Sequence, residues 1–209
     1  VTRHHHKLNK MNTTTIKTLA VIALISVSQM ASAQKAKTWN IDKSHASVRF
    51  GINHFFSEVS GKFKSFDGDI QFSPDNLTNS SVSFKIDVAS VDTDEADRDE
   101  HLKSADFFNA TEYPSITFQS TEFKKIDQSN YKVIGNLTMR GVTKNVELPL
   151  KITGRMDNPW KEGYEILGIS IDTTLNRTDY GIGTGSRAAT AVVSDDVAVN
   201  ISMELDSQK

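Results

Sequence analysis

Cysteine is absent from this chain of 209 residues. Its absence excludes disulfides, thiol catalysis, thiolate metal sites and a lipid-modified cysteine. Proline is scarce, with four residues, and tryptophan and tyrosine together are fewer than the eleven phenylalanines. The sequence also has no G-x-S-x-G elbow, phosphate-binding loop or H-E-x-x-H motif. The common signatures of serine hydrolases, nucleotide-binding proteins and zinc proteases are therefore missing.

The first 33 residues have the pattern of a leader. Lys17 precedes an apolar run over residues 19–27, and Ala31-Ser32-Ala33 follows it. A basic region, a short apolar region and an A-x-A site together predict a secretory signal peptide over residues 11–33, cleaved after Ala33. Residues 1–10 precede Met11 and are interpreted as a leader extension or a tag remnant. We therefore expect a periplasmic protein.

The remaining chain, residues 34–209, is long enough for one domain with a substantial core. The leader holds four basic residues and no acid, so the net charge of −2 becomes −6 when it is removed. This charge favours solubility and argues against nucleic acid or an anionic membrane as the main partner. The apolar run of the leader is too short to span a bilayer comfortably, so we expect no stable membrane insertion of the mature chain.

Alternation of apolar and polar residues dominates the mature chain. It is clearest over residues 48–52, 82–88, 146–152, 167–175 and 197–205. A period of two predicts strands with one apolar face, and short turns containing Gly, Pro, Asn or Asp separate them. About eight such strands indicate an all-β protein, either an up-and-down antiparallel barrel or a sandwich. We favour the barrel because many inward residues are large and would converge on one interior.

Residues 98–108 do not alternate and are densely ionisable, ending in Phe107-Phe108. We predict a short helix here, with Thr93 or Asp94 as its N-cap, Glu95 and Asp97 in its first turn and Lys103 near its end. A lone helix in a one-sheet protein needs a surface to cover, which in a barrel is the mouth. The segment is therefore the predicted gate of an internal cavity.

Two groups of polar residues suggest chemistry. Outside the leader there are three histidines, His45, His54 and His101, and three histidines can hold a catalytic zinc ion. Their spacing fits no compact motif, so a metal-dependent hydrolase or hydratase is the alternative hypothesis, and we expect no metal. Asp42, Ser44 and His45 are the residue types of a hydrolytic triad, but one short loop cannot give them the relay geometry.

Several blocks of the chain resemble the YceI-like family of exported, polyisoprenoid-binding proteins. The blocks are Asp42-Lys43-Ser44-His45, residues 48–54, 59–63, 66–68, 98–108, 113–114, 118–121, 135–144 and 177–181. They follow the order of the family and cover nearly the whole mature chain. The resemblance implies a lipocalin-like barrel with a helix at its mouth, an amphiphilic isoprenoid such as a quinone or polyprenyl lipid as ligand, and a homodimer. It gives little support for catalysis, so we expect neither an enzyme nor a cofactor.

Strand parity and this resemblance together define the expected site. The expected apolar wall of the barrel lumen consists of Val48, Phe50, Ile52, Phe63, Phe72, Phe84, Ile86, Phe107, Phe108, Phe118, Leu148 and Ile171. The expected polar rim, which would meet a head group, consists of His54, Arg98, Asp99, His101, Arg177 and Asp179. For the charged residues of the rim we also consider acid–base catalysis, and we prefer a structural role in which they pair where the helix meets the barrel.

Overall fold

The computed structural model describes residues 36–185 and 192–209. The expected leader extension (1–10) and signal peptide (11–33) lie outside the described residues. The strands are β1 (Thr38–His54), β2 (Ser57–Phe63), β3 (Phe66–Gln71), β4 (Ser81–Asp87), β5 (Val91–Asp92), β6 (Ser115–Lys125), β7 (Asn130–Met139), β8 (Val142–Asp157), β9 (Tyr164–Asn176) and β10 (Val193–Gln208). The helical segments are α2 (Ala96–Lys103) and the 3₁₀ turns η1 (Leu77–Asn79), η2 (Val88–Ser90) and η3 (Arg177–Tyr180).

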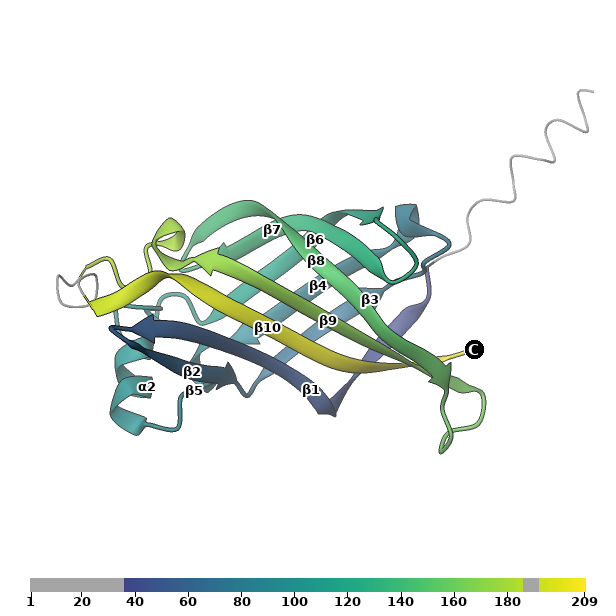
Figure 1. The fold of residues 1–209 in the computed structure, drawn as a ribbon, viewed down its shortest axis with the longest axis horizontal. Helices are drawn as coiled ribbons and strands as arrows, with labels where there is room; N and C mark the ends of the chain where they lie inside the picture. Colours follow the sequence, from purple (N-terminus) through teal and green to yellow (C-terminus); the bar gives the residue numbers. More distant parts are fainter. Residues whose placement is uncertain (1–35, 186–191) are drawn as a thin grey trace, which may run out of the picture. The chain divides into compact units, whose positions relative to one another are not determined.

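All the strands pair antiparallel in one sheet, in the order β10-β9-β8-β7-β6-β4-β3-β1-β2-β5 (Figure 1). A further pairing of β10 with β1 closes the sheet into a barrel. The closed ring holds eight strands, because β1 pairs with β3 at its start and β2 pairs only with β1 and β5. The predicted all-β antiparallel barrel with one short helix is therefore confirmed, and the sandwich is not formed.

The long strand β1 pairs with β10 along one edge and with both β3 and β2 along the other, because its course is irregular. Its register against β10 shifts between Ile41 and Ala46, which marks a bulge. Before the bulge Thr38 and Trp39 pair with β3, and after it residues 48–54 pair with β2. The residues within the bulge are turned to solvent, so the polar side chains of Asp42 and His45 lie on the outer surface.

One end of the barrel is closed by packed side chains. Trp39, Tyr131, Leu167 and Leu205 are each no more than 2% exposed there. The indole nitrogen of Trp39 donates a hydrogen bond to the carbonyl oxygen of Phe72, at 2.9 Å, so its burial leaves no unpaired donor. This end of the barrel, where β9 begins and β10 ends, is called the closed end below.

A buried carboxylate also lies at the closed end. Glu165 is 5% exposed and forms ion pairs with Lys37 and Arg155. Arg155 Nη2 donates to Glu165 Oε1 at 3.0 Å. The hydrogen bond from Arg155 lowers the pKa of Glu165 below its ordinary value, against the opposing effect of burial, and Lys37 adds to the lowering.

We predict that this ion cluster makes stability depend on pH. Because the folded-state pKa of Glu165 is lowered, its contribution is present above the ordinary pKa of 4.5 and is lost as the pH falls through the folded value. Glu165→Gln should cost about 1–3 kcal/mol at pH 7, since Lys37 and Arg155 are partly exposed and can be rehydrated. Urea unfolding at pH 7 and pH 3 measures both effects. An equal loss of stability in the wild type and the variant between these pH values would contradict the prediction.

The helix lies beside the opposite end of the barrel, near the end of β1 (Figure 1). Its N-cap is Glu95, whose carboxylate accepts hydrogen bonds from the backbone N–H groups of Asp97 and Arg98. The prediction of Thr93 or Asp94 was wrong because the backbone N–H and hydroxyl of Thr93 are bound by Asp99. Asp94 has a φ of 60°, in the left-handed region. The helix ends at Lys103, as expected, and turns carry the chain on to Phe107 and Phe108. Among the helices within residues 36–185 and 192–209, none is long and apolar enough to cross a bilayer.

Candidate functional site

The barrel encloses a cavity of about 230 Å³. An apolar cavity of about 150 Å³ is already large enough to stay dry and accept benzene. Among the described residues, the lining is apolar except for Arg49, Thr173 and Arg177. Such a wall offers almost no hydrogen bonds to water, so an apolar ligand is its natural occupant.

All twelve residues expected on the apolar wall do line this cavity. They are Val48, Phe50, Ile52, Phe63, Phe72, Phe84, Ile86, Phe107, Phe108, Phe118, Leu148 and Ile171. That these residues contact a ligand stays a prediction. Nine of them stand on strands, where period-two alternation gives the inward face directly. Phe72 directly follows β3, and Phe107 and Phe108 come from the turn after α2.

Sequence reasoning missed other parts of the wall. Val199 and Ile201 lie on an alternating segment, and their parity could have identified them. Leu102 of α2 and Ile182 after η3 also line the cavity, but they lie outside strands and carry no parity signal. Their contribution depends on how the helix and the segment after η3 fold over the barrel.

The burial of inward residues changes along the barrel. On β10, Leu205 and Met203 are buried, whereas Ile201 and Val199 are half-buried. On β1, Val48 is buried and Ile52 is half-buried. The half-buried residues face the cavity toward the end of β1 and the start of β10. We call this end of the barrel, with α2 and η3 beside it, the mouth.

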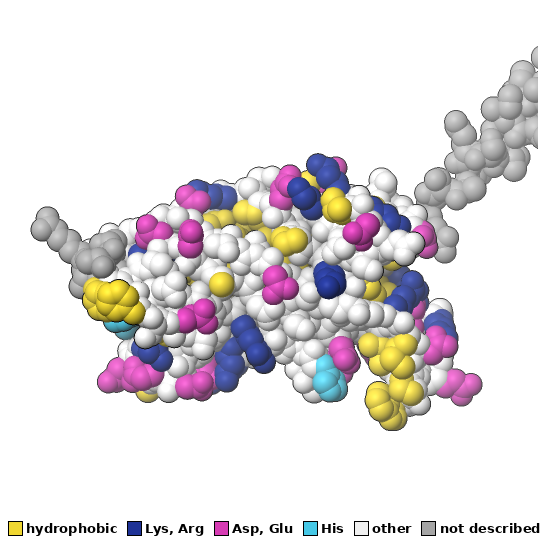
Figure 2. Space-filling view, in the orientation of Figure 1, with side chains coloured by type: hydrophobic (Ala, Val, Ile, Leu, Met, Phe, Trp, Pro, Cys, Tyr) yellow, Lys and Arg dark blue, Asp and Glu magenta, His cyan; other side chains and the backbone are white. Residues whose placement is uncertain are grey.

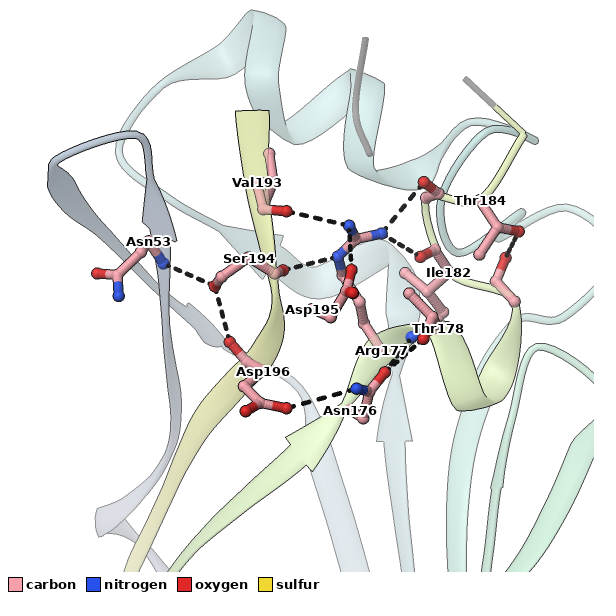
Figure 3. Close-up of polar contacts among 12 residues, drawn as sticks. Asn53, Asn176, Arg177, Thr178, Ile182, Thr184, Val193, Ser194, Asp195 and Asp196 are labelled. Atoms are coloured by element: carbon pink, nitrogen blue, oxygen red, sulfur yellow. Dashed lines mark hydrogen bonds and ion pairs between the residues drawn. The ribbon is translucent and has the colours of Figure 1, made fainter. Parts of the chain in front are cut away.

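Arg177 lies at the mouth and is 4% exposed (Figure 3). Its Nε donates to the carbonyl oxygen of Ser194 at 2.9 Å, and its Nη1 donates to those of Ile182 and Gly183 at 2.8 and 3.1 Å. Its Nη2 donates to the carbonyl oxygen of Val193 at 3.2 Å and to Asp195 Oδ1 at 2.9 Å.

These contacts use all five N–H donors of the guanidinium group. They join the segment after η3 to the start of β10. The guanidinium therefore has no donor left for a ligand head group, and the cavity meets the residue through its aliphatic stem.

Side-chain amides and hydroxyls extend this arrangement around the mouth (Figure 3). Asn176 caps η3 by accepting from the Thr178 N–H, and its amide donates to Asp196 Oδ1 at 3.4 Å. Ser194 Oγ accepts from the Asn53 N–H at 3.3 Å and donates to the Asp196 carbonyl oxygen at 2.9 Å. The ends of β1 and β9 are in this way tied to the start of β10.

The other residues of the expected polar rim do not reach the cavity wall. Arg98 donates from Nε to Thr93 Oγ1 and from Nη2 to the Thr93 carbonyl oxygen, both at 2.8 Å. Asp99 accepts from Thr93 N–H at 2.8 Å and from its hydroxyl at 2.6 Å. Both residues therefore fasten α2 to the end of β5. These contacts favour the structural role over acid–base catalysis.

The remaining three rim residues are exposed. Asp179 forms an ion pair with Lys144 at 2.7 Å. The ring of His101 stacks edge-on against Phe107, and that of His54 stacks edge-on against Phe55. Within the described chain, Arg177 is thus the one expected rim residue on the cavity wall. The turns and caps that direct these side chains away from the lumen leave no periodic signal in the sequence.

The three histidines do not form a shared site. His45 Nδ1 lies 2.8 Å from Asp42 Oδ2 and 3.9 Å from Glu204 Oε2, and neither His54 nor His101 joins them. Asp42, His45 and Glu204 are the one group within residues 36–185 and 192–209 that could hold a metal ion. They lie on the outer surface, away from the cavity lining. The alternative hypothesis of a metal site built from His45, His54 and His101 is therefore wrong.

The same cluster explains why Asp42, Ser44 and His45 are no hydrolytic triad. The Ser44 hydroxyl and the Asp42 carboxylate both approach Nδ1 of His45, at 3.2 and 2.8 Å. A relay needs one partner on each ring nitrogen. The hydrogen bond from His45 lowers the pKa of Asp42 to about 2, and the same bond raises the pKa of His45. The group is therefore a surface ion pair.

Comparison with known proteins places the chain in a family. The model of the YceI-like domain matches residues 39–205. Protein YceI of Shigella flexneri is 39% identical over 196 residues, which cover 92% of this chain and 99% of that protein. The chain therefore belongs to the YceI-like family, as its sequence blocks predicted.

Solved structures agree with this assignment. The crystal structure of the Campylobacter jejuni YCEI protein matches with a TM-score of 0.66 and 34% identity, over 74% of this chain and 88% of that chain. A Saccharophagus degradans structure described as a polyisoprenoid-binding domain matches with a TM-score of 0.60 over 83% of this chain and 99% of that chain. Its identity of 14% supports a shared fold alone.

Proposed function

We propose that this protein binds an amphiphilic isoprenoid lipid, of the quinone or polyprenyl type, for carriage, storage or sensing. The lipid tail lies in the barrel cavity and its polar end lies at the mouth. The observation that carries the proposal is the cavity of about 230 Å³ with an almost wholly apolar wall. The description of the Saccharophagus degradans domain as polyisoprenoid-binding supports the same class of ligand.

The energetics of such binding are favourable without any hydrogen bond to the tail. Burying one CH₂ group gains about 0.8 kcal/mol, so one five-carbon isoprene unit gains roughly 2–4 kcal/mol. Association costs about 4–15 kcal/mol in lost freedom. A few buried units therefore suffice. Specificity would come from the depth of the cavity and from groups at the mouth, and the chain would act as a carrier with no cofactor and no catalysis.

Two further parts of the proposal concern the setting of the protein. The leader pattern supports export to the periplasm, where a lipid carrier would cross an aqueous space between membranes. The family resemblance supports a homodimer. N-terminal sequencing of the exported protein tests cleavage after Ala33, and sedimentation equilibrium tests the dimer.

Analysis of co-purified lipid tests the central proposal. Protein purified without detergent from its exporting host should release an isoprenoid lipid into an organic extract, identified by mass spectrometry. Protein stripped of lipid should also take up an added isoprenoid quinone at about one molecule per barrel. An extract free of lipid, together with no uptake of the quinone, would overturn the proposal.

A further inference from the structure

The turn between β1 and β2 carries two exposed aromatic side chains. His54 pairs with Ser57, so Phe55 and Phe56 form a two-residue turn. Phe55 is 62% exposed and Phe56 is fully exposed. Figure 2 shows an exposed hydrophobic cluster at the end of the barrel where this hairpin lies in Figure 1. We call Phe55 and Phe56 the hairpin tip.

The conformation of the hairpin tip is unfavourable for its residue type. Phe55 has a φ of 51°, in the left-handed region, where glycine or asparagine is preferred and a bulky side chain is strained. A hydrogen bond from the Phe55 N–H to the Val192 carbonyl oxygen, at 2.9 Å, holds the turn in place. Phe55 is mostly exposed and its ring contacts the exposed ring of His54, so packing among the described residues does not account for a phenylalanine there. Strain of this kind is a reason to look for a function.

The hairpin tip lies at the mouth of the cavity. Phe50 and Ile52 line the cavity on the same strand, and the tip begins three residues after Ile52. The chain has another exposed aromatic residue, Trp160, which is 88% exposed. It lies in the turn between β8 and β9, at the closed end. The position of the hairpin tip thus connects it with the entry of a ligand, and that of Trp160 does not.

Among the described residues, the hairpin tip and the residues next to it in the sequence carry no charge. Residues 53–57 contain no lysine, arginine, aspartate or glutamate. Glu58 pairs with Asn53, and its carboxylate lies over Gly51, farther from the tip. Asp195 is paired with Arg177. A neutral apolar tip suits an uncharged or zwitterionic surface better than an anionic one, which would select for basic residues.

We propose that Phe55 and Phe56 insert into the interface of a zwitterionic phospholipid bilayer and bring the mouth of the barrel to the lipid surface. This inference rests on the proposed function, because an isoprenoid lipid resides in bilayers and must enter from one. A protein partner is a poorer fit, since a stable interface needs about 800 Å² per partner and the tip is a projecting two-residue turn. A bilayer needs no complementary pocket and accepts aromatic rings at its interface.

The test compares ligand uptake from two sources. Phosphatidylcholine vesicles carrying an isoprenoid quinone present the ligand in a bilayer, and the same quinone dispersed from ethanol presents it without one. The variant Phe55→Asn/Phe56→Ser should take up quinone from vesicles at least tenfold more slowly than the wild type. Its uptake from the ethanol dispersion should be unchanged. Its melting temperature should be equal or higher, because asparagine tolerates a positive φ at position 55.

Two matched variants complete the design. Trp160→Ser removes an exposed aromatic residue from the closed end and should leave uptake from vesicles unchanged. Phe56→Trp should retain rapid uptake. Its tryptophan fluorescence should shift to the blue when vesicles are added, and the fluorescence of the wild type, which has phenylalanine at position 56, should not show this shift. Raising the salt concentration should not release the protein from vesicles, because the contact is apolar.

Three outcomes would overturn the inference. Equal uptake from vesicles by the wild type and the Phe55→Asn/Phe56→Ser variant is the first. An equal effect of Trp160→Ser is the second. A change of oligomeric state in the Phe55→Asn/Phe56→Ser variant with unchanged uptake is the third, and it would assign the tip to a second copy of the chain. Cosedimentation with quinone-free vesicles measures membrane binding without any ligand. A wild type that binds these vesicles but takes up no quinone would contradict the proposed ligand and leave the membrane-binding surface supported.

Discussion

Replacing Ile171 with aspartate should abolish loading of the cavity. Ile171 stands on β9, lines the cavity and is half-buried, so its side chain faces the enclosed space. A bound lipid tail would have to displace water from the new carboxylate without offering it a partner, which costs about 3 kcal/mol or more. Affinity for an isoprenoid quinone should therefore fall at least a hundredfold. Fluorescence titration with a quinone measures this effect.

The matched control for this variant is Thr174→Asp. Thr174 lies on the same strand, but it is exposed and faces outward. The same charge placed there should change the affinity by less than a factor of about three, because an exposed carboxylate keeps its water. If Ile171→Asp still bound the quinone as the wild type does, the cavity would not be the binding site.

Replacing Arg177 with alanine should give the largest loss of stability among the residues at the mouth. Four backbone carbonyl oxygens, of Ser194, Ile182, Gly183 and Val193, would lose their donor. A buried acceptor without a partner costs about 1–3 kcal/mol, and water entering the new space would offset part of the sum. We expect the free energy of unfolding to fall by about 3–5 kcal/mol in urea titrations.

Two further variants separate geometry from charge at this position. Arg177→Lys keeps the positive charge but has three donors on a single nitrogen, so it should recover less than half of the lost stability. Asp195→Asn removes the ion pair with an exposed carboxylate and should cost less than about 1 kcal/mol. A fall of less than 1 kcal/mol for Arg177→Ala would show that the carbonyl oxygens are satisfied in another way.

The sequence predicted the wall of the cavity because strand parity is a local signal. Successive side chains of a strand point to opposite faces, so Val48, Phe50 and Ile52 can be assigned to one face without knowledge of their neighbours. Alternation and short turns left a barrel and a sandwich open, and the large inward residues favoured the barrel. The pairing of β1 with β10, which closes the barrel, joins the two ends of the domain and has no local signal.

The sequence could not predict the mouth because its contacts are between distant segments and involve backbone carbonyl groups. Nothing in the order of residues shows that Arg177 binds carbonyl oxygens at positions 182, 183, 193 and 194. The bulge in β1 that turns His45 outward is also invisible to alternation. The sequence placed Arg98 and Asp99 on the rim and favoured a structural role for them, but it did not reveal that their partner is Thr93.

The ion cluster around Glu165 has a consequence for the direction in which the proposed lipid would enter and leave the barrel. Among the described residues, Lys37, Arg155 and the packed indole of Trp39 lie at the closed end, opposite the mouth. The proposed lipid would therefore enter at the mouth with its hydrocarbon terminus leading and leave with its polar group leading. The depth from this entrance to Leu167 and Leu205 would act as a ruler, so that isoprenoids longer than the tube leave their surplus units outside.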